Sequence, residues 1–104
     1  MKTSELTGIA LDWAVAECQG HDFPAADAFS GIFNPSTEWS QGGPIIEREN
    51  IGLTAYHRGG GMAWRAVSFN DKNKAYGPTP LIAAMRCYVA SKMGDDIELS
   101  EGLA

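Results

Sequence analysis

Hydrophobic and polar positions along the chain predict one helix near the start. Apolar residues recur every three to four positions between Leu6 and Cys18, and this spacing is typical of a helix that is buried on more than one side. Thr3 or Ser4 can cap its first turn, and Gly20 can terminate it. We expect Trp13 to lie in the core.

A second helix is predicted near the end of the chain. Thr79 supplies a cap and Pro80 a first helical position, and together they form a strong start signal. A buried stripe follows over residues 81–93, and Gly94 ends the pattern. We expect Ile82 and Met85 from this stripe to be core residues.

Between these helices the period changes from that of a helix to that of a strand. Residues 51–57 and 62–69 alternate between the two faces of a strand, and the glycine-rich segment 58–61 between them predicts a hairpin turn. Apolar groups on both faces of the second strand indicate a sheet covered on two sides. The sequence therefore predicts an α+β fold, with a small antiparallel sheet (central hairpin about 51–69) sandwiched between the N-terminal and C-terminal helices of one domain, residues 1–104.

The remaining segments are predicted from their turn residues. Residues 21–43 read as an irregular loop, and Pro44 as the first position of a short helix that ends at Asn50. Residues 70–78 are expected to form a polar loop. Two alternatives stay open for the tail after Asp95, an edge strand or a segment draped over the core.

Composition narrows the class of protein. The chain has 104 residues, of which 44% are hydrophobic and 20% charged, and these values fit a globular domain rather than a disordered chain. Its longest apolar runs are too short for a membrane span, and its first residues lack the pattern of a signal peptide. We therefore expect a cytoplasmic protein.

The net charge of −5 hides an uneven distribution. Residues 1–50 carry a net −6, residues 51–94 a net +5 and residues 95–104 a net −4. The simplest interpretation is that the basic middle lies against the acidic front, and on that basis nucleic acid is an unlikely partner. The alternative is a nucleic-acid surface that combines four cations with neighbouring aromatic residues. Its candidate residues are Arg58, Arg65, Lys72 and Lys74 beside Tyr56, Trp64 and Tyr76.

Candidate chemistry is sparse. Cys18 and Cys87 fall within the helical patterns and are expected to be reduced thiols without a disulfide. Cys18 and His21 have a ligand-like spacing, and His57 and Cys87 could complete a zinc site, but a closed zinc site normally shows two paired half-sites. We expect no metal, no cofactor and no catalytic residues, because no motif combines a nucleophile with a base and an orienting group.

The stretch from Asn34 to Pro44 is the most unusual in the sequence. In one interpretation Trp39 plugs the core while Ser36 or Thr37 stabilises a local turn. In the other, a rigid loop exposes Trp39 to a protein partner, and a small-ligand or catalytic site in residues 34–44 is a further alternative. The candidate partner-binding residues are Pro35, Ser36, Thr37, Glu38, Trp39 and Gln41.

Three blocks of sequence resemble the NinX family of tailed bacteriophages and prophages. They are MKTSELTGIALDWAVA at the start, PSTEWSQGGPIIERE from Pro35 and GPTPLIAAMRCYVASK from Gly77. More distantly the chain is similar to small phage proteins with an α–β–α sandwich. The resemblance implies a phage accessory protein that acts in the bacterial cytoplasm, and it brings no catalytic residue to this chain. The expected function is non-enzymatic binding of a host or phage protein.

Overall fold

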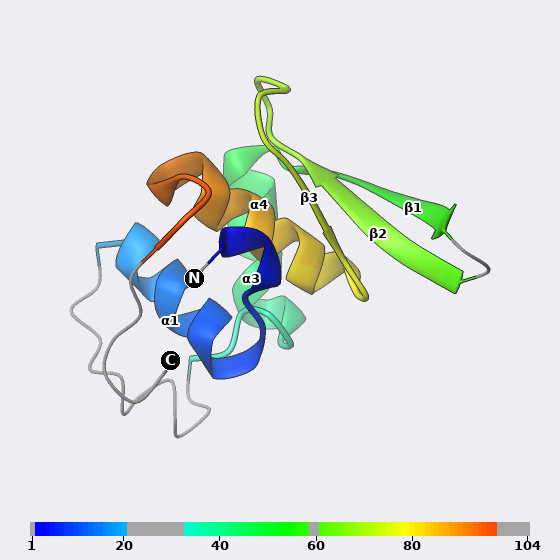
Figure 1. Ribbon diagram of the computed structural model, residues 1–104. Coiled ribbons are helices and arrows are strands. Elements are labelled where there is room, and N and C mark those ends of the chain that lie inside the picture. Colours follow the sequence, from blue (N-terminus) through cyan, green and yellow to red (C-terminus); the bar gives the residue numbers. More distant parts are fainter. Residues whose placement is uncertain (1, 21–32, 59–60, 98–104) are drawn as a thin grey trace.

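The computed structural model describes residues 2–20, 33–58 and 61–97. In Figure 1 the helices gather at one end of the molecule, and the hairpin of β1 and β2 extends away from them. In chain order the elements are the 3₁₀ helix η1 (Thr3–Glu5), α1 (Gly8–Cys18), α3 (Trp39–Glu49), β1 (Gly52–Arg58), β2 (Gly61–Val67), β3 (Lys74–Gly77) and α4 (Pro80–Met93).

The three strands form one antiparallel sheet in the order β1-β2-β3. Ala55 of β1 pairs with Trp64 of β2, and Ala66 of β2 pairs with Ala75 of β3. The α+β prediction is confirmed, with helices flanking the sheet in sequence, and the central hairpin lies within two residues of its predicted bounds. In space, α4 is the helix that packs most extensively on the sheet, and α1 and α3 pack on α4.

The prediction of a polar loop over residues 70–78 is wrong, because its second half is strand β3. The first half closes a second hairpin, with Asp71 in the left-handed region at φ +64°. The Asn70 Oδ1 oxygen accepts hydrogen bonds from the Ser68 hydroxyl and from the Lys72 N–H, at 2.7 and 3.1 Å. These hydrogen bonds fix the conformation of the turn. The chain therefore reverses direction at a defined place, and the four residues of β3 can pair with β2.

Helix α4 begins and ends as predicted. The Thr79 Oγ1 oxygen accepts a hydrogen bond from the Ile82 N–H at 3.1 Å, and Pro80 occupies the first helical position. Gly94 ends the helix with φ +85°. Along its length α4 buries Met85 and Val89 completely, so it forms the centre of the core.

The N-terminal helix is shorter than predicted. Thr3 does not cap it; the Thr3 N–H donates to the Asp95 carbonyl at 2.8 Å, and the Thr3 hydroxyl donates to the Gly94 carbonyl at 2.6 Å. Leu6 is fully buried in the extended segment that follows η1. Helix α1 then starts at Gly8, whose φ of +55° interrupts any helix running in from upstream.

Helix α3 begins at Trp39, five residues before the predicted start, and Pro44 lies inside it. Proline cannot donate a hydrogen bond to the carbonyl of Ser40 four positions earlier. Both Ser40 and Pro44 are exposed, so water can reach that carbonyl. The helix continues through the proline to Asn50, which ends it in the left-handed region at φ +52°.

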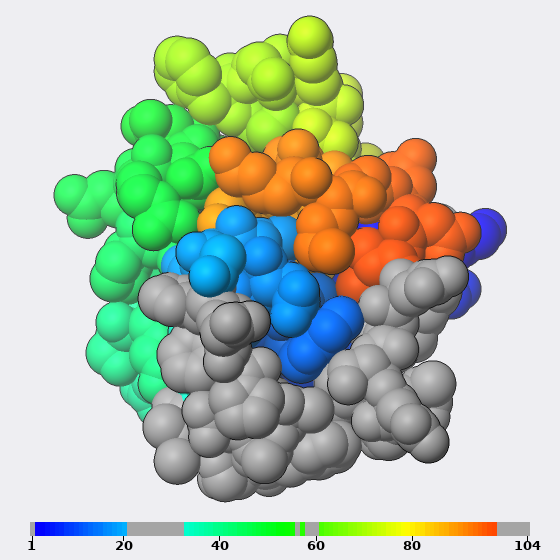
Figure 2. All heavy atoms as spheres, turned by 90° about the vertical axis from the view of Figure 1, so that its left-hand side faces the viewer, coloured from blue at the N-terminus to red at the C-terminus, as the bar shows by residue number. Residues whose placement is uncertain are grey.

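The predicted core residues differ in burial. Met85 is fully buried, which confirms the prediction, whereas Trp13 and Ile82 are only partly buried and pack against the core. In the tail, Asp96 forms an isolated antiparallel bridge with Lys2. In Figure 2, α1 in blue and the end of α4 in orange lie side by side on one face.

Candidate functional site

A groove lies where the turn before α3 meets the first turn of α4. Its volume is about 210 Å³. Trp39 is 53% exposed and stands beside it, so this tryptophan does not plug the core. The lining residues are Ser36, Thr37, Trp39, Thr79, Pro80, Leu81 and Ile82.

The turn that forms one side of the groove is fixed by hydrogen bonds at several points. The Asn34 N–H donates to the Gln41 Oε1 oxygen at 2.7 Å. The Ser36 N–H donates to the Asp12 Oδ1 oxygen of α1 at 2.9 Å. The Glu38 N–H donates to the Asn34 carbonyl at 2.9 Å. The turn is therefore held both to α1 and to α3, which gives Trp39 a defined position.

Gly42 lets α3 approach the other walls of the groove. A Cβ atom at this position would collide with the Pro35 carbonyl oxygen and would lie 2.6 Å from the Leu81 Cδ2 atom. No residue with a side chain fits there without moving the turn or α4. Gly42 thus sets the distance between the two sides of the groove.

The six predicted partner-binding residues fall into two groups. Thr37, Glu38 and Trp39 are exposed and can meet a partner. Pro35 and Ser36 are buried, and the Gln41 side chain bonds the turn, so these three residues support the site from within. The prediction missed the other wall of the groove, residues 79–82, because the same residues read as an ordinary helix start.

Asp12 is a buried carboxylate behind this turn. Burial raises its pKa from the ordinary value, and the hydrogen bonding from Ser36 offsets only part of that rise. The Ser36 hydroxyl oxygen is itself buried, and no partner within the described part of the chain meets it with hydrogen-bond geometry. The support of the groove therefore includes two polar groups whose burial carries an energetic cost.

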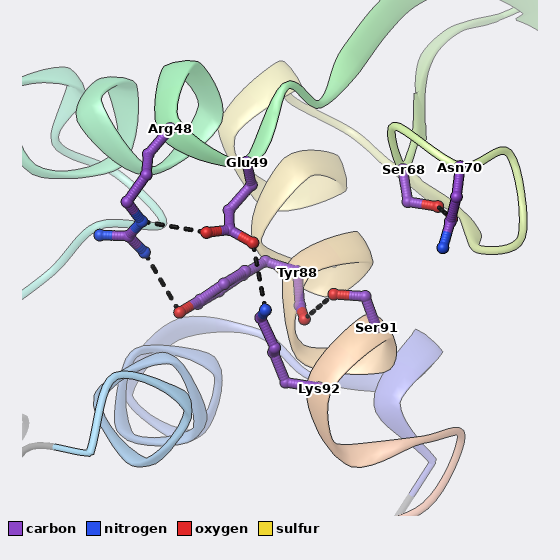
Figure 3. A network of polar contacts seen from close by, with 7 residues as sticks. All are labelled: Arg48, Glu49, Ser68, Asn70, Tyr88, Ser91 and Lys92. Atoms are coloured by element: carbon purple, nitrogen blue, oxygen red, sulfur yellow. Dashed lines mark hydrogen bonds and ion pairs between the residues drawn. The ribbon is translucent and has the colours of Figure 1, made fainter.

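A second, more polar hollow of about 210 Å³ lies between the ends of α3 and α4 and the turn from β2 to β3 (Figure 3). The Glu49 carboxylate pairs with Arg48 at 3.0 Å and with Lys92 at 3.3 Å, and the hydrogen bond from Arg48 is the main reason why its pKa is lowered. Both cations lie about 6 Å from the centre of the Tyr88 ring. Lys92 of the basic middle thus pairs with a residue of the acidic front. Among the described residues the expected pairing of the two regions is limited to this contact, because Arg65, Lys72, Lys74 and Arg86 form no ion pair with a described carboxylate.

Neither cysteine is poised as a nucleophile. Burial raises the pKa of Cys87 to about 11 and that of Cys18 to about 12, so both are protonated thiols at neutral pH. The Cys87 thiol donates to the Asn73 carbonyl at 3.6 Å. His21 of the considered zinc site lies outside the described residues, and the residues that are described contain no group of three or more metal-ligating side chains.

The four predicted nucleic-acid residues are only partly brought together. Arg65 of β2 pairs with Tyr76 of β3, and Lys74 lies two positions before Tyr76, so strand alternation places these three side chains on one face. Trp64 lies on the opposite face. Lys72 is exposed in the turn between β2 and β3. Arg58 and Tyr56 belong to β1, but their side chains lie outside the described part.

Comparison with protein families identifies the group to which the chain belongs. The model of the family described as bacteriophage P22 NinX matches residues 2–92, a span that runs from the start of η1 into the last turn of α4. The chain belongs to the NinX family. The family match places it among phage accessory proteins, and it includes both walls of the groove. None of the curated proteins compared with the chain matches it. Among the described helices, none has the length and apolar character needed to cross a membrane.

Proposed function

We propose that this NinX-family chain is a non-enzymatic accessory protein that binds a host or phage protein in the bacterial cytoplasm, and that Trp39 is the main contact. The observation that carries the proposal is a half-exposed tryptophan at the rim of an apolar groove. Tryptophan is enriched among the residues that dominate binding energy, especially where it meets a partner beside a pocket. The partner that fits is a protein segment with an apolar side chain for the groove.

The support of the turn favours binding over catalysis. Asp12 and Gln41 hold the turn before any partner arrives, which lowers the entropy lost on association. The groove offers apolar walls of Pro80, Leu81 and Ile82, and hydroxyl groups that can orient a partner backbone.

The test uses the full chain as bait in phage-infected cells, followed by reconstitution. A captured protein is purified and its affinity is measured for the native chain, for Trp39→Ala and for Met62→Ala. Met62 is 62% exposed and lies on β2, away from the groove residues, so it is a matched apolar control. We expect Trp39→Ala to weaken binding by about 30-fold or more, the range of a dominant interface residue. Equal affinities for all three chains would contradict the proposal.

A further inference from the structure

Two adjoining hollows follow the free edge of β3. One of about 460 Å³ opens onto the sheet beside Tyr76, and one of about 340 Å³ continues toward η1. Ser4, Lys74 and Arg86 line both hollows. They therefore form one continuous channel between the edge of the sheet and the N-terminal segment.

Arg86 is the fixed cation of this channel. Its Nε–H donates to the Leu6 carbonyl at 2.8 Å, and its NH1 group donates to the Tyr76 carbonyl at 2.7 Å. No carboxylate of the described residues forms an ion pair with it, and burial lowers its pKa from the ordinary value. The guanidinium has N–H donors left for an anion, and an anion would offset the cost of burying the charge.

Further positive charge lies on the sheet side of the channel. The three strands contain basic residues but no aspartate or glutamate. Arg65, Lys72 and Lys74 form no ion pair with any other described residue, in contrast to Lys92. Lys74 and Arg86 therefore give the β3 side of the channel an excess of positive charge, while Asp95 and Asp96 line its other end.

The backbone adds a donor at the same place. The Asn73 carbonyl accepts a hydrogen bond from the Ser68 N–H at 2.9 Å, so the backbone groups of Asn73 point toward β2. The carbonyl of Tyr76 points the other way, toward Arg86. Along an antiparallel strand these two orientations alternate from residue to residue, so the N–H of Lys74, two positions before Tyr76, also points away from β2. An anion beside Lys74 can meet its ammonium group and its backbone N–H together.

Tyr76 supplies a flat apolar surface beside these cations. Its side chain is 43% exposed, and it lies across the strands from Arg65. Aromatic rings interleaved with cations on an open sheet suit unpaired bases, which stack on the ring while the cations neutralise phosphates. Asp95 and Asp96 line the far end of the channel, so a phosphate backbone is favoured on the β3 side.

We propose that this channel and the open sheet face bind single-stranded nucleic acid, with Lys74 and Arg86 at the phosphates and Tyr76 stacked on a base. The site is separate from the Trp39 groove, which lies at the N-terminal starts of α3 and α4. Its failure would leave the protein-binding proposal intact.

The probe is a fluorescent oligothymidylate of about 15 nucleotides, a length that covers a single small domain. Its anisotropy with the full chain is followed between about 50 and 200 mM salt, where phosphate contacts lose affinity steeply. The variants are Lys74→Gln and Tyr76→Leu. Lys92→Gln removes the same charge from a lysine that pairs with Glu49, and serves as the matched control.

We expect a complex whose affinity falls as salt rises. Lys74→Gln should reduce the slope of log affinity against log salt by about 0.7, the value for one phosphate contact on a single strand. Tyr76→Leu should weaken binding by about fivefold or more and leave the slope unchanged, because stacking releases no counterions. Lys92→Gln should bind like the native chain.

Three results would overturn the proposal. The first is the absence of a complex at the lowest salt. The second is an equal loss for Lys92→Gln and Lys74→Gln, which would indicate a diffuse charge effect. The third is full competition by polyglutamate with no effect of Tyr76→Leu, which would indicate a surface for acidic peptides. Melting curves check that each variant folds, and Tyr76→Gln, which also removes the ring without changing the charge, replaces Tyr76→Leu if the latter unfolds.

Discussion

The groove beside Trp39 and the channel beside β3 lie against different parts of α4 and differ in charge, in polarity and in how they are held. The groove has apolar walls and hydroxyl groups, and its position depends on buried contacts through Gly42 and Asp12. The channel carries Lys74 and Arg86, neither of which forms an ion pair with a described carboxylate.

This difference shows how an acidic chain can present a cationic surface. Lys92 is paired with Glu49 at the end of α3, while the lysine and arginine of β2 and β3 remain outside any described ion pair. The net charge of a protein therefore does not predict which ligands a given face attracts, because that depends on the charged side chains present on that face. The following predictions separate the two regions.

The largest effect is expected from Met85→Ala, because both regions stand on α4. Met85 is fully buried, and its truncation should lower the free energy of unfolding by about 2–5 kcal/mol through lost burial and a cavity. Urea unfolding measures this change. A loss below about 1 kcal/mol would show that α4 is not the common support of both regions.

Gly42→Ala should damage the groove alone. The added methyl group collides with Pro35 and Leu81, so we expect a loss of about 1–3 kcal/mol in unfolding free energy and weaker partner binding. Gly43→Ala is the matched control, since its Cβ would meet only a Trp39 ring carbon at 3.9 Å. If Gly42→Ala and Gly43→Ala behaved alike, the close approach at position 42 would not be setting the groove.

Asp12 gives the support of the groove a pH dependence. Because the folded-state pKa of Asp12 is raised, folding favours the protonated carboxyl; this contribution to stability is complete below the unfolded pKa and is lost as pH rises through the raised value. Asp12→Asn keeps an acceptor for the Ser36 N–H and removes the charge. Relative to the native chain, the variant should therefore gain stability as pH rises from about 4 to about 7. Urea unfolding at both pH values checks the sign, and a relative gain by the native chain would refute it.

The smallest effect is expected from Lys92→Gln. Its ion pair with Glu49 is partly exposed, with the Lys92 side chain 47% accessible, so its removal should cost about 0.5 kcal/mol or less. Thermal melting at low and high salt measures it. A loss that grew at high salt would exclude a screened surface pair.

The sequence predicted the elements that carry their own signals. Helix α4 has a cap, a proline at its first position and a terminating glycine, and all three act as expected. The sheet hairpin has two alternating segments around a glycine-rich turn. Strand β3 escaped prediction because its four residues follow a turn fixed by Asn70 and offer too few positions for a period.

The groove was only half predictable. Trp39 and its neighbours attracted attention through composition, but their partners at residues 79–82 lie about forty positions away in sequence. Hydrophobic periodicity reports contacts within one helix or strand, so it gives no sign that residues this far apart lie together. Only the packing of α3 on α4 brings them together. The role of Arg86 was missed for the same reason, because the two carbonyls it meets belong to distant segments.

The hydrogen bond from Thr3 to Gly94 also bears on the order in which the molecule assembles. It joins positions 91 residues apart, so the chain must close a very long loop before the bond forms. The two hairpins close over a few residues each and can form early, and the N-terminal segment then docks late. Because Ser4 of that segment lines the channel, we expect the channel to be completed only after α4 has been synthesised and folded.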